Sequence, residues 1–323
     1  MLNIQNNIPL APLTTFKIGG PAKFFAVIKT LEELQAAVTW ALDHKEKIFV
    51  LGGGANILIA DAGLNGLVLR VQNTDFTVLK KENTTATVLA GAGLTFGQLV
   101  TKAAGANFGG LDFLGGLPGN LGGGIYGNAG WTDRSIGDFV ESVTVVDQGT
   151  AETKIVAHHE CNFVYRGSKF KTWPVVIWEA MLKLPAIEKT EAMRAIADNT
   201  KKKLASQPTT FPCAGCIFQN VRLSQQPGNA ILQKLISAEA DSGKLRLVDA
   251  GILPSSWLID RAGLKGKTFG GAQVSDKHAN FIVNTGGATA AEVIELIGLM
   301  KKQVREKFGV ELYEEVQLLG YDK

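Results

Sequence analysis

The sequence predicts an α+β fold of three successive units. Two observations carry this prediction. Apolar residues recur at helical spacing in two segments that each begin with a capping box, and short β-rich runs stand between these segments. With 323 residues, 46% of them hydrophobic and 20% charged, the chain is long enough to build several domains around a large core.

The first unit covers residues 1–72. Thr30 and Glu33 form a capping box, which predicts a helix to residue 43. One face of this helix carries apolar side chains, namely Leu31, Leu34, Val38 and Leu42. Strand-like runs follow at 48–51, 56–60 and 67–71, so this unit mixes helix and strand.

Two more units follow. β-rich runs at 77–79, 87–89, 143–146 and 175–178 predict a second unit over residues 73–205, which ends in a charged helix over 186–206. The third unit, residues 206–313, contains a late helix with a capping box formed by Thr289 and Glu292. By spacing, this helix buries Val293, Leu296, Ile297, Met300 and Val304. We expect a tail strand within 314–323 to rejoin the first unit.

Residues 105–130 contain eleven glycines and one charged residue, Asp112. The segment has no three-residue repeat, as collagen would, and it is too apolar for a flexible linker. Glycine lets another backbone or a ligand approach the main chain closely. With so few charges, main-chain N–H groups would have to hold any phosphate. The segment therefore predicts a cofactor cradle.

A second glycine-rich loop, LGGGAN at 51–56, follows a strand. It lacks the Rossmann fingerprint, because Ile57 occupies the third glycine position and no clear helix follows. Alone, the loop predicts a tight structural turn as readily as a phosphate site. Together, the two glycine-rich loops favour an extended dinucleotide over a mononucleotide.

Cys213 and Cys216 form a CxxC pair with several interpretations. A zinc site lacks a second CxxC, because His158, His159 and Cys161 are distant and irregularly spaced, so we expect no metal. A redox disulfide would need a helix from the first cysteine, whereas residues 217–221 are strand-like. A redox disulfide, a buried structural pair and a proton-donating cysteine all remain open.

Two further clusters have both bland and functional interpretations. Tyr165 and Arg166 lie in a segment of mixed cations and aromatics, which is typical of a surface turn but also suits an arginine that clamps a carboxylate. His278 precedes the apolar run 281–283, where a structural hydrogen bond is the usual role.

The charge balance, with 33 Lys and Arg against 30 Asp and Glu, does not favour a nucleic-acid partner. The first residues show no signal-peptide pattern, and the most apolar stretch, 84–101, is broken by glycines and polar residues. With three cysteines, these features predict a cytoplasmic protein with no membrane partner. We expect a monomer.

Eight segments, taken in order, resemble one family. They are TFKIGGPA at 15–22, LGGGAN at 51–56, GGLPGNLGG at 115–123 with NAG at 128–130, YRGSKFK at 165–171, PCAGCIFQN at 212–220, AGLKG at 262–266, KHANF at 277–281 and EV at 315–316. The ordered set spans nearly the whole chain and resembles the UDP-N-acetylenolpyruvoylglucosamine reductase (MurB) family.

The resemblance implies a PCMH-type FAD-binding fold, as in the vanillyl-alcohol oxidases, with two subdomains at 1–72 and 73–205. It adds a C-terminal α+β substrate-binding domain at 206–313. The implied cofactors are non-covalent FAD and NADPH. NADPH would reduce the flavin, and hydride would then pass to C3 of UDP-N-acetylglucosamine enolpyruvate, giving UDP-N-acetylmuramate for peptidoglycan synthesis.

The resemblance also assigns residues. Arg166 and Glu315 would stabilise the enolate-like charge that develops on the substrate, and Cys216 would protonate C2. Cofactor-binding positions would be Gly52, Gly53, Gly54, Ala55, Asn56, Gly115, Pro118, Gly119, Gly122, Gly123, Asn128 and Ala129. Substrate-binding positions would be Tyr165, Asn220 and His278.

The chain departs from the family pattern at several positions. Cys216 stands where serine is usual, but a thiol, with a reference pKa of about 8.5, is a sensible proton donor. Cys213 would be a bystander. Gln219 and Val221 replace a common lysine and proline, and residues 222–253 look like an insertion with a helix around 231–235. The region between Tyr165 and residue 209 predicts the shorter-loop subclass.

Two other functions remain in competition. One keeps the FAD fold but oxidises an alcohol or a sugar. The other is an inactive nucleotide-binding or scaffold protein, which the joint presence of Arg166, Cys216 and Glu315 disfavours.

Overall fold

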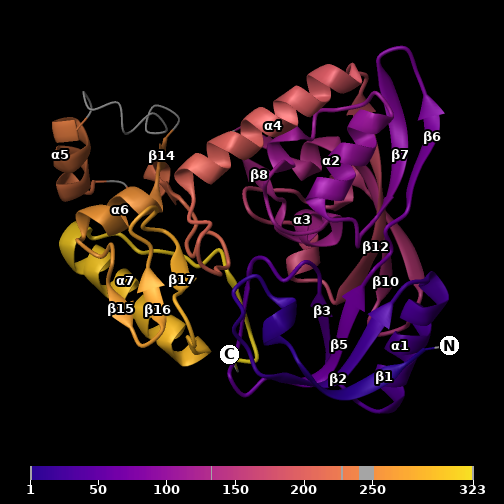
Figure 1. Cartoon of the computed structure of the whole chain (residues 1–323), viewed down its shortest axis with the longest axis horizontal. Helices are drawn as coiled ribbons and strands as arrows, with labels where there is room; N and C mark the ends of the chain where they lie inside the picture. Colours follow the sequence, from indigo (N-terminus) through magenta and orange to yellow (C-terminus); the bar gives the residue numbers. More distant parts are fainter. Residues whose placement is uncertain (1, 132, 227, 240–250, 322–323) are drawn as a thin grey trace. The chain divides into compact units, whose positions relative to one another are not determined.

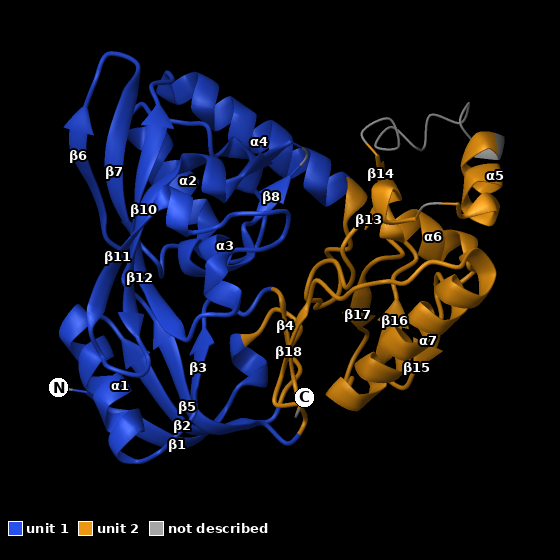
Figure 2. Cartoon of the chain, turned by 180° about the vertical axis from the view of Figure 1, so that it is seen from behind, with its two compact units in different colours: residues 1–13, 20–55, 62–205 blue, residues 14–19, 56–61, 206–323 orange. Residues whose placement is uncertain are grey.

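The computed structural model describes residues 2–131, 133–226, 228–239 and 251–321. The chain divides into two compact units (Figure 2). Unit 1 comprises residues 1–13, 20–55 and 62–205, and unit 2 comprises residues 14–19, 56–61 and 206–323. Both units are therefore discontinuous in sequence, because two short N-terminal segments cluster with the C-terminal half. The predicted boundary near residue 72 stays a prediction.

Unit 1 begins with a four-stranded sheet in the order β1-β2-β5-β3. Its elements are β1 (Ile4–Pro9), η1 (Ala11–Leu13), β2 (Pro21–Ile28), α1 (Leu31–Asp43), β3 (Ile48–Leu51) and β5 (Leu64–Val71). β5 runs parallel to both β2 and β3, while β1 pairs with β2 antiparallel. The parallel arrangement brings the C-terminal end of β3, and with it the loop at 52–55, to one edge of the sheet.

The rest of unit 1 is a five-stranded antiparallel sheet in the order β11-β10-β12-β7-β6, accompanied by helices (Figure 1). The strands are β6 (Phe76–Lys81), β7 (Thr85–Gly91), β10 (Val140–Asp147), β11 (Thr153–Ala157) and β12 (Val175–Pro185). Helices and short elements are α2 (Phe96–Gly105), η2 (Asp112–Leu114), α3 (Leu121–Gly127), β8 (Gly130–Trp131), β9 (Arg134–Ser135), η3 (Ile136–Phe139), η4 (His158–Glu160), η5 (Lys169–Lys171) and α4 (Lys189–Ser206). α3 packs against β7 and β12, and one hydrophobic core runs through both sheets.

Unit 2 has a core of its own around helix α7. Its elements are β4 (Ile57–Ile59), β13 (Val221–Arg222), η6 (Leu223–Gln225), α5 (Ala230–Glu239), β14 (Ile252–Leu253), α6 (Ser255–Arg261), β15 (Thr268–Phe269), β16 (Ala272–Val274), β17 (Ile282–Asn284), α7 (Ala290–Phe308) and β18 (Gln317–Leu319). β18 pairs in parallel with β4, so the chain's last strand joins a segment of the N-terminal third.

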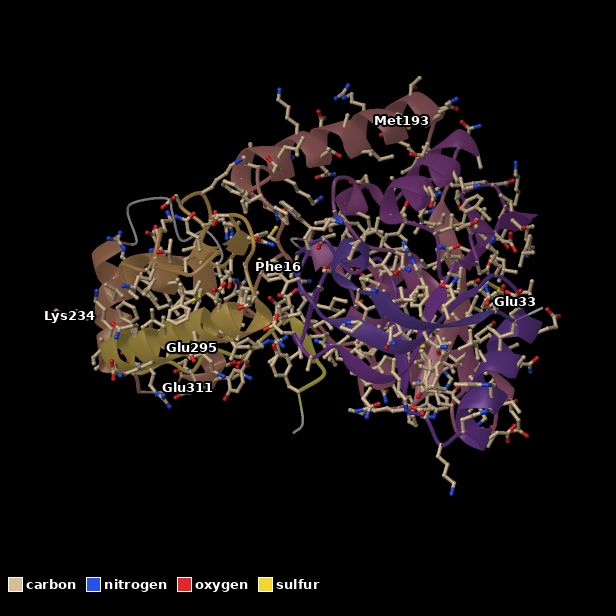
Figure 3. The ribbon with its side chains drawn as sticks, turned by 60° about the horizontal axis from the view of Figure 1, so that its bottom comes forward. Phe16, Glu33, Met193, Lys234, Glu295 and Glu311 are labelled. Carbon is tan, nitrogen blue, oxygen red and sulfur yellow. The ribbon has the colours of Figure 1, made fainter. Side chains whose placement is uncertain are left out.

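Helix α7 confirms its prediction in detail. Thr289 and Glu292 form the expected capping box. All five apolar positions predicted for its inner face are buried, and each contributes roughly 1.5–3 kcal/mol by leaving water. The opposite face is polar, and Glu295 on it is exposed (Figure 3).

Two local expectations are wrong. Leu42, predicted on the inner face of α1, is 44% exposed, because the buried face of this helix runs through Leu34, Ala37, Val38 and Ala41 instead. The strand-like run 217–221 forms a strand only from Val221, and its earlier part is held by an isolated bridge at Phe218. The tail forms a strand at 317–319, within the predicted range 314–323, and this strand pairs with residues 57–59.

The predicted insertion at 222–253 contains the expected helix, α5. Residues 227 and 240–250 of this insertion lie outside the described residues. Among the helices of the described chain, none combines the length and apolarity that a membrane crossing requires.

Asp61 offers a test of how segment 56–61 is held in unit 2. Its carboxylate accepts the N–H groups of Ala290 (2.8 Å) and Ala291 (3.0 Å) at the first turn of α7. Asp61→Ala removes both acceptors, so we expect the free energy of unfolding to fall by about 1–2 kcal/mol, measured by urea denaturation. Asp61→Asn keeps one acceptor oxygen and should lose less. Equal stability of Asp61→Ala and the native chain would contradict this role.

Candidate active site

The two glycine-rich loops of unit 1 lie against each other, main chain to main chain. A Cβ placed on Gly53 would come within 2.7 Å of the Cα of Gly119, and one on Gly52 within 2.6 Å of Oδ1 of Asn120. Any side chain at these positions would force the loops apart. The structure thus brings segments 51–56 and 115–123 into contact. The sequence indicated that both are glycine-rich loops, but not that they touch.

A cleft of about 490 Å³ opens beside this contact, entirely within unit 1. Gly52, Gly53 and Asn120 line it, and its wall also carries two cations, Lys29 and Arg70, and one carboxylate, Asp75. This volume is in the usual range for small-molecule and cofactor sites. A negatively charged ligand with polar substituents fits this lining.

Main-chain donors are available at the loop contact. Among the hydrogen bonds of the described residues, none has the N–H of Gly53, Ala55 or Gly119 as donor. Main-chain N–H groups without an internal acceptor need an outside one, and an anion can supply it. The diphosphate of FAD is such an anion, so these two loops fit the flavin cofactor that the resemblance implies.

Gly122 and Gly123 behave differently from this expectation. Their N–H groups donate to Ala92 O (2.8 Å) and to Oδ1 of Asn120 (3.0 Å), so both are already engaged inside the protein. A Cβ on Gly122 would lie 3.0 Å from the Cβ of Ala92. The structure supports a packing role for these glycines, and their contact with a cofactor stays a prediction.

Arg166 projects from a tight four-residue turn in unit 1. Val164 and Gly167 close this turn with two main-chain hydrogen bonds of 3.0 and 3.1 Å. Arg166 has φ of 54°, a conformation that is costly for a side chain with a Cβ and that concentrates at functional sites. Its Nη1 donates to Gly130 O (3.1 Å), and its guanidinium lies 5.2 Å from the ring of Tyr165.

The turn is fixed from outside by two side chains. Lys171 Nζ donates to Arg166 O (2.7 Å), and Asn128 Nδ2 donates to Val164 O (2.9 Å). Oδ1 of Asn128 accepts the N–H of Gly137 (3.0 Å). The side chain of Asn128 therefore serves the arginine turn, and its predicted contact with a cofactor stays a prediction.

Cys216 and Glu315 both belong to unit 2. Ile217, which directly follows Cys216, links their two segments. The carbonyl of Ile217 accepts the N–H of Glu315 (2.7 Å), so the main chains on either side are in direct contact. Asn56 Nδ2 donates to Glu315 O (3.1 Å). The segments that carry the predicted proton donor, Cys216, and the predicted carboxylate, Glu315, are thus neighbours within unit 2.

Asn280 is a residue that the sequence placed in a motif without a role. It is 2% exposed and pairs with Phe218 as a strand would: its Oδ1 accepts the N–H of Phe218 (3.0 Å), and its Nδ2 donates to Phe218 O (2.7 Å). Its own carbonyl accepts the N–H of Ile217 (2.8 Å). Three hydrogen bonds therefore fix the main chain next to Cys216.

The two predicted substrate-binding residues of unit 2 have distinct settings. Asn220 Oδ1 accepts the N–H of Ser255 (3.3 Å). Burial lowers the pKa of His278, and nearby Lys265 lowers it further, although a main-chain hydrogen bond opposes both. Its buried Nδ1 has no hydrogen-bond partner in the described chain. This orphaned nitrogen suits a polar ligand group.

The cysteines are all free thiols in the described structure, and Cys213 and Cys216 form no disulfide there. Burial raises the pKa of Cys213, which keeps that thiol protonated at neutral pH. Among the described residues, no group of His, Cys, Asp and Glu side chains is arranged to hold a metal ion.

Sequence reasoning missed Asn120, Asn280 and Lys203. Asn120 had a readable signal, because an asparagine ahead of Leu121 and three glycines is a typical helix N-cap, and its side chain does accept from Gly123. Asn280 and Lys203 act through contacts with residues more than 60 positions away, which no local pattern reveals.

Two family models match the chain. One, described as the FAD binding domain, matches residues 22–156, and the other, described as the C-terminal domain of UDP-N-acetylenolpyruvoylglucosamine reductase, matches residues 207–319. These matches confirm the predicted pairing of a flavin-binding region with a C-terminal domain.

Relatives match over nearly full length. UDP-N-acetylenolpyruvoylglucosamine reductases of Solibacter usitatus and Carboxydothermus hydrogenoformans are 37% and 36% identical, over 99% and 98% of this chain and 97% and 94% of theirs. The crystal structure of the reductase (MurB) from Thermus caldophilus is similar, with a TM-score of 0.75, 30% identity, and coverage of 99% of this chain and 100% of that one. The chain therefore belongs to the UDP-N-acetylenolpyruvoylglucosamine reductase family of flavoenzymes.

Proposed function

We propose that this chain is the NADPH-dependent flavoenzyme that reduces UDP-N-acetylglucosamine enolpyruvate to UDP-N-acetylmuramate. The observation that carries the proposal is the contact between two glycine loops in unit 1, with main-chain donors and a cleft lined by Lys29, Arg70 and Asp75 beside it. Family membership supplies the substrate. The substrate and NADPH are the small-molecule partners of a monomeric, cytoplasmic enzyme.

The loops at 52–55 and 115–119 would hold FAD, with the diphosphate facing main-chain N–H groups. When bound, FAD supplies the hydride that it takes from NADPH. Side chains are absent where the loops meet, since even a methyl group on Gly53 would collide with Gly119.

Hydride addition at C3 of the enolpyruvyl group moves negative charge through C2 onto the carboxylate. A guanidinium and a carboxylic acid beside that group stabilise the enolate-like dianion, and Arg166 and Glu315 are assigned to this role. Loss of one such donor typically costs about 2.7–4 kcal/mol of transition-state stabilisation. The strained turn that holds Arg166 supports its assignment, because such strain persists only where surrounding contacts impose it.

The proton at C2 is assigned to Cys216. The thiol loses its proton to C2 and is re-protonated from water, so the reaction is balanced over one turnover. The main chain beside Cys216 is fixed by Asn280 and by the Ile217–Glu315 contact, which would give the proton a defined direction of delivery.

The direct test is to purify the protein, record its visible spectrum, and follow NADPH oxidation with and without UDP-N-acetylglucosamine enolpyruvate. The proposal expects flavin absorbance and oxidation that depends on the enolpyruvyl substrate. Rapid oxygen consumption with an alcohol or a sugar would instead favour an oxidase, and a colourless protein that does not take up FAD would favour a scaffold.

Cys216→Ala separates the two half-reactions. We expect it to keep FAD and its reduction by NADPH, because neither uses the thiol, but to lose turnover of the enolpyruvyl substrate by about 10²-fold or more. Stopped-flow absorbance measures each half-reaction. Cys216→Ser, which restores a proton donor, should recover part of the activity, and a fully active alanine variant would refute the assignment.

Gly53→Ala tests the loop contact. Its Cβ would collide with the main chain of Gly119, so we expect FAD affinity to fall by about tenfold or more, as measured by isothermal titration of FAD. Gly127→Ala is the matched control, since a Cβ there meets nothing within 4 Å. Equal FAD affinity in the two variants would show that the contact does not shape the cofactor site.

A further inference from the structure

Lys203 is a buried lysine in unit 1 that the proposed chemistry does not use. It lies on α4 and is 1% exposed. Its Nζ donates hydrogen bonds to Phe113 O (2.6 Å) and Gly115 O (2.8 Å) and lies 4.1 Å from the ring centre of Trp131. Both carbonyls belong to the turn that leads into the glycine-rich loop.

Two further residues on the same face of α4, Ile196 and Thr200, pack closely against Gly115 and Gly116. A Cβ on Gly115 would come within 2.9 Å of Ile196 O, and one on Gly116 within 3.1 Å of the Cα of Thr200. Gly116 has φ of 74°, which favours glycine. Gly119, where the loop meets Gly53, lies four positions after Gly115, which Lys203 contacts.

Burying an ammonium is costly, and an apolar side chain would fill the same space without that cost. The hydrogen bonds to the two carbonyls offset this cost, because a buried carbonyl without a donor would itself be unfavourable. The charged groups nearby are Asp112 on η2 and Arg134 on β9. Asp112 is engaged by Arg134 (2.8 and 2.9 Å) and by Asn199 (2.8 Å).

We infer that Lys203 is a positioning residue for the flavin. Its ammonium fixes the carbonyls of Phe113 and Gly115, which holds the following loop against Gly53, and its buried positive charge favours the negative diphosphate. The inference rests on the proposed function, because it needs FAD to occupy this loop.

A pH dependence follows. Burial lowers the pKa of Lys203 to about 8, with Asp112 opposing this shift and Arg134 adding to it. As pH rises through 8 the ammonium becomes a neutral amine, whose hydrogen bonds are weaker. FAD affinity should therefore fall between pH 7 and pH 9.5.

The stability of the fold should change in the opposite direction. The unfolded chain keeps the proton on Lys203 up to the ordinary lysine pKa of 10.5, whereas the folded chain releases it near 8. Between these values the unfolded state binds more protons, so the Lys203 contribution favours folding increasingly as pH rises. A purely structural lysine would move fold stability alone, without an opposite change in FAD affinity.

The experiment measures FAD affinity, by titration, and the urea midpoint of the full chain, each at pH 7 and pH 9.5. The proteins are the native chain, Lys203→Met, Lys203→Arg and, as a matched control, Lys201→Met, which changes an exposed lysine of the same helix. Lys203→Met keeps the bulk of the stem but no donor. We expect it to bind FAD about tenfold or more weakly at pH 7, with no pH dependence.

The native chain and Lys201→Met should lose FAD affinity by up to about tenfold from pH 7 to pH 9.5, while Lys203→Arg, charged throughout, should not. Native-like affinity in Lys203→Met, or a native affinity that does not change with pH, would overturn the inference while leaving the proposed function standing. A native chain that binds no FAD at either pH would overturn both. If Lys203→Met does not fold, the native and Lys203→Arg profiles decide.

Discussion

The structure of unit 1 depends on one close approach: the main chains of Gly53 and Gly119 are in contact, with no room for a side chain between them. This contact explains why two segments over sixty residues apart are both rich in glycine. It also decides what kind of ligand they serve, since loops without side chains recognise by their N–H groups, and an anion is the ligand that such groups bind. The sheet that ends at β3, the N-cap at Asn120 and the packing of α3 all hold these two loops in place.

In each unit, side chains from elsewhere in the sequence hydrogen-bond to the main chain beside the residues assigned to the reaction, and so hold those residues in place. In unit 1, Asn128 and Lys171 hold the turn of Arg166 in a conformation that the residue would not adopt alone. In unit 2, Asn280 pairs with Phe218, and Ile217 joins the segments of Cys216 and Glu315. Polar side chains that satisfy main-chain groups are thus the common means by which this chain orients its candidate site.

Much of the fold was predictable from the sequence, because its signals are local. The N-cap at Thr30, the capping box at Thr289 and apolar spacing placed α1 and α7, and glycine content identified both loops. The sequence could not reveal the clustering of segments 14–19 and 56–61 with unit 2. Segment 56–61 joins through pairing of β4 with β18, and segment 14–19 through side-chain hydrogen bonds from Thr15 to Cys213 O and from Asn284 to Phe16 O. Nor could the sequence show that the N–H groups of Gly122 and Gly123 donate hydrogen bonds to acceptors within the protein. The Lys-rich run at 201–203 gives no sign that its last residue is buried, yet Lys203 is 1% exposed while Lys201 and Lys202 are exposed. Such features depend on what the rest of the chain brings to a residue.

Hydrogen exchange of the full chain, with and without FAD, tests the central claim most directly. We expect FAD to protect the amides of Gly53, Ala55 and Gly119 strongly. The amides of Gly122 and Gly123, already bonded inside the protein, should change much less. Tight FAD binding without protection at 53–55 and 119 would contradict the account, because the cofactor would then be held by some other part of the chain.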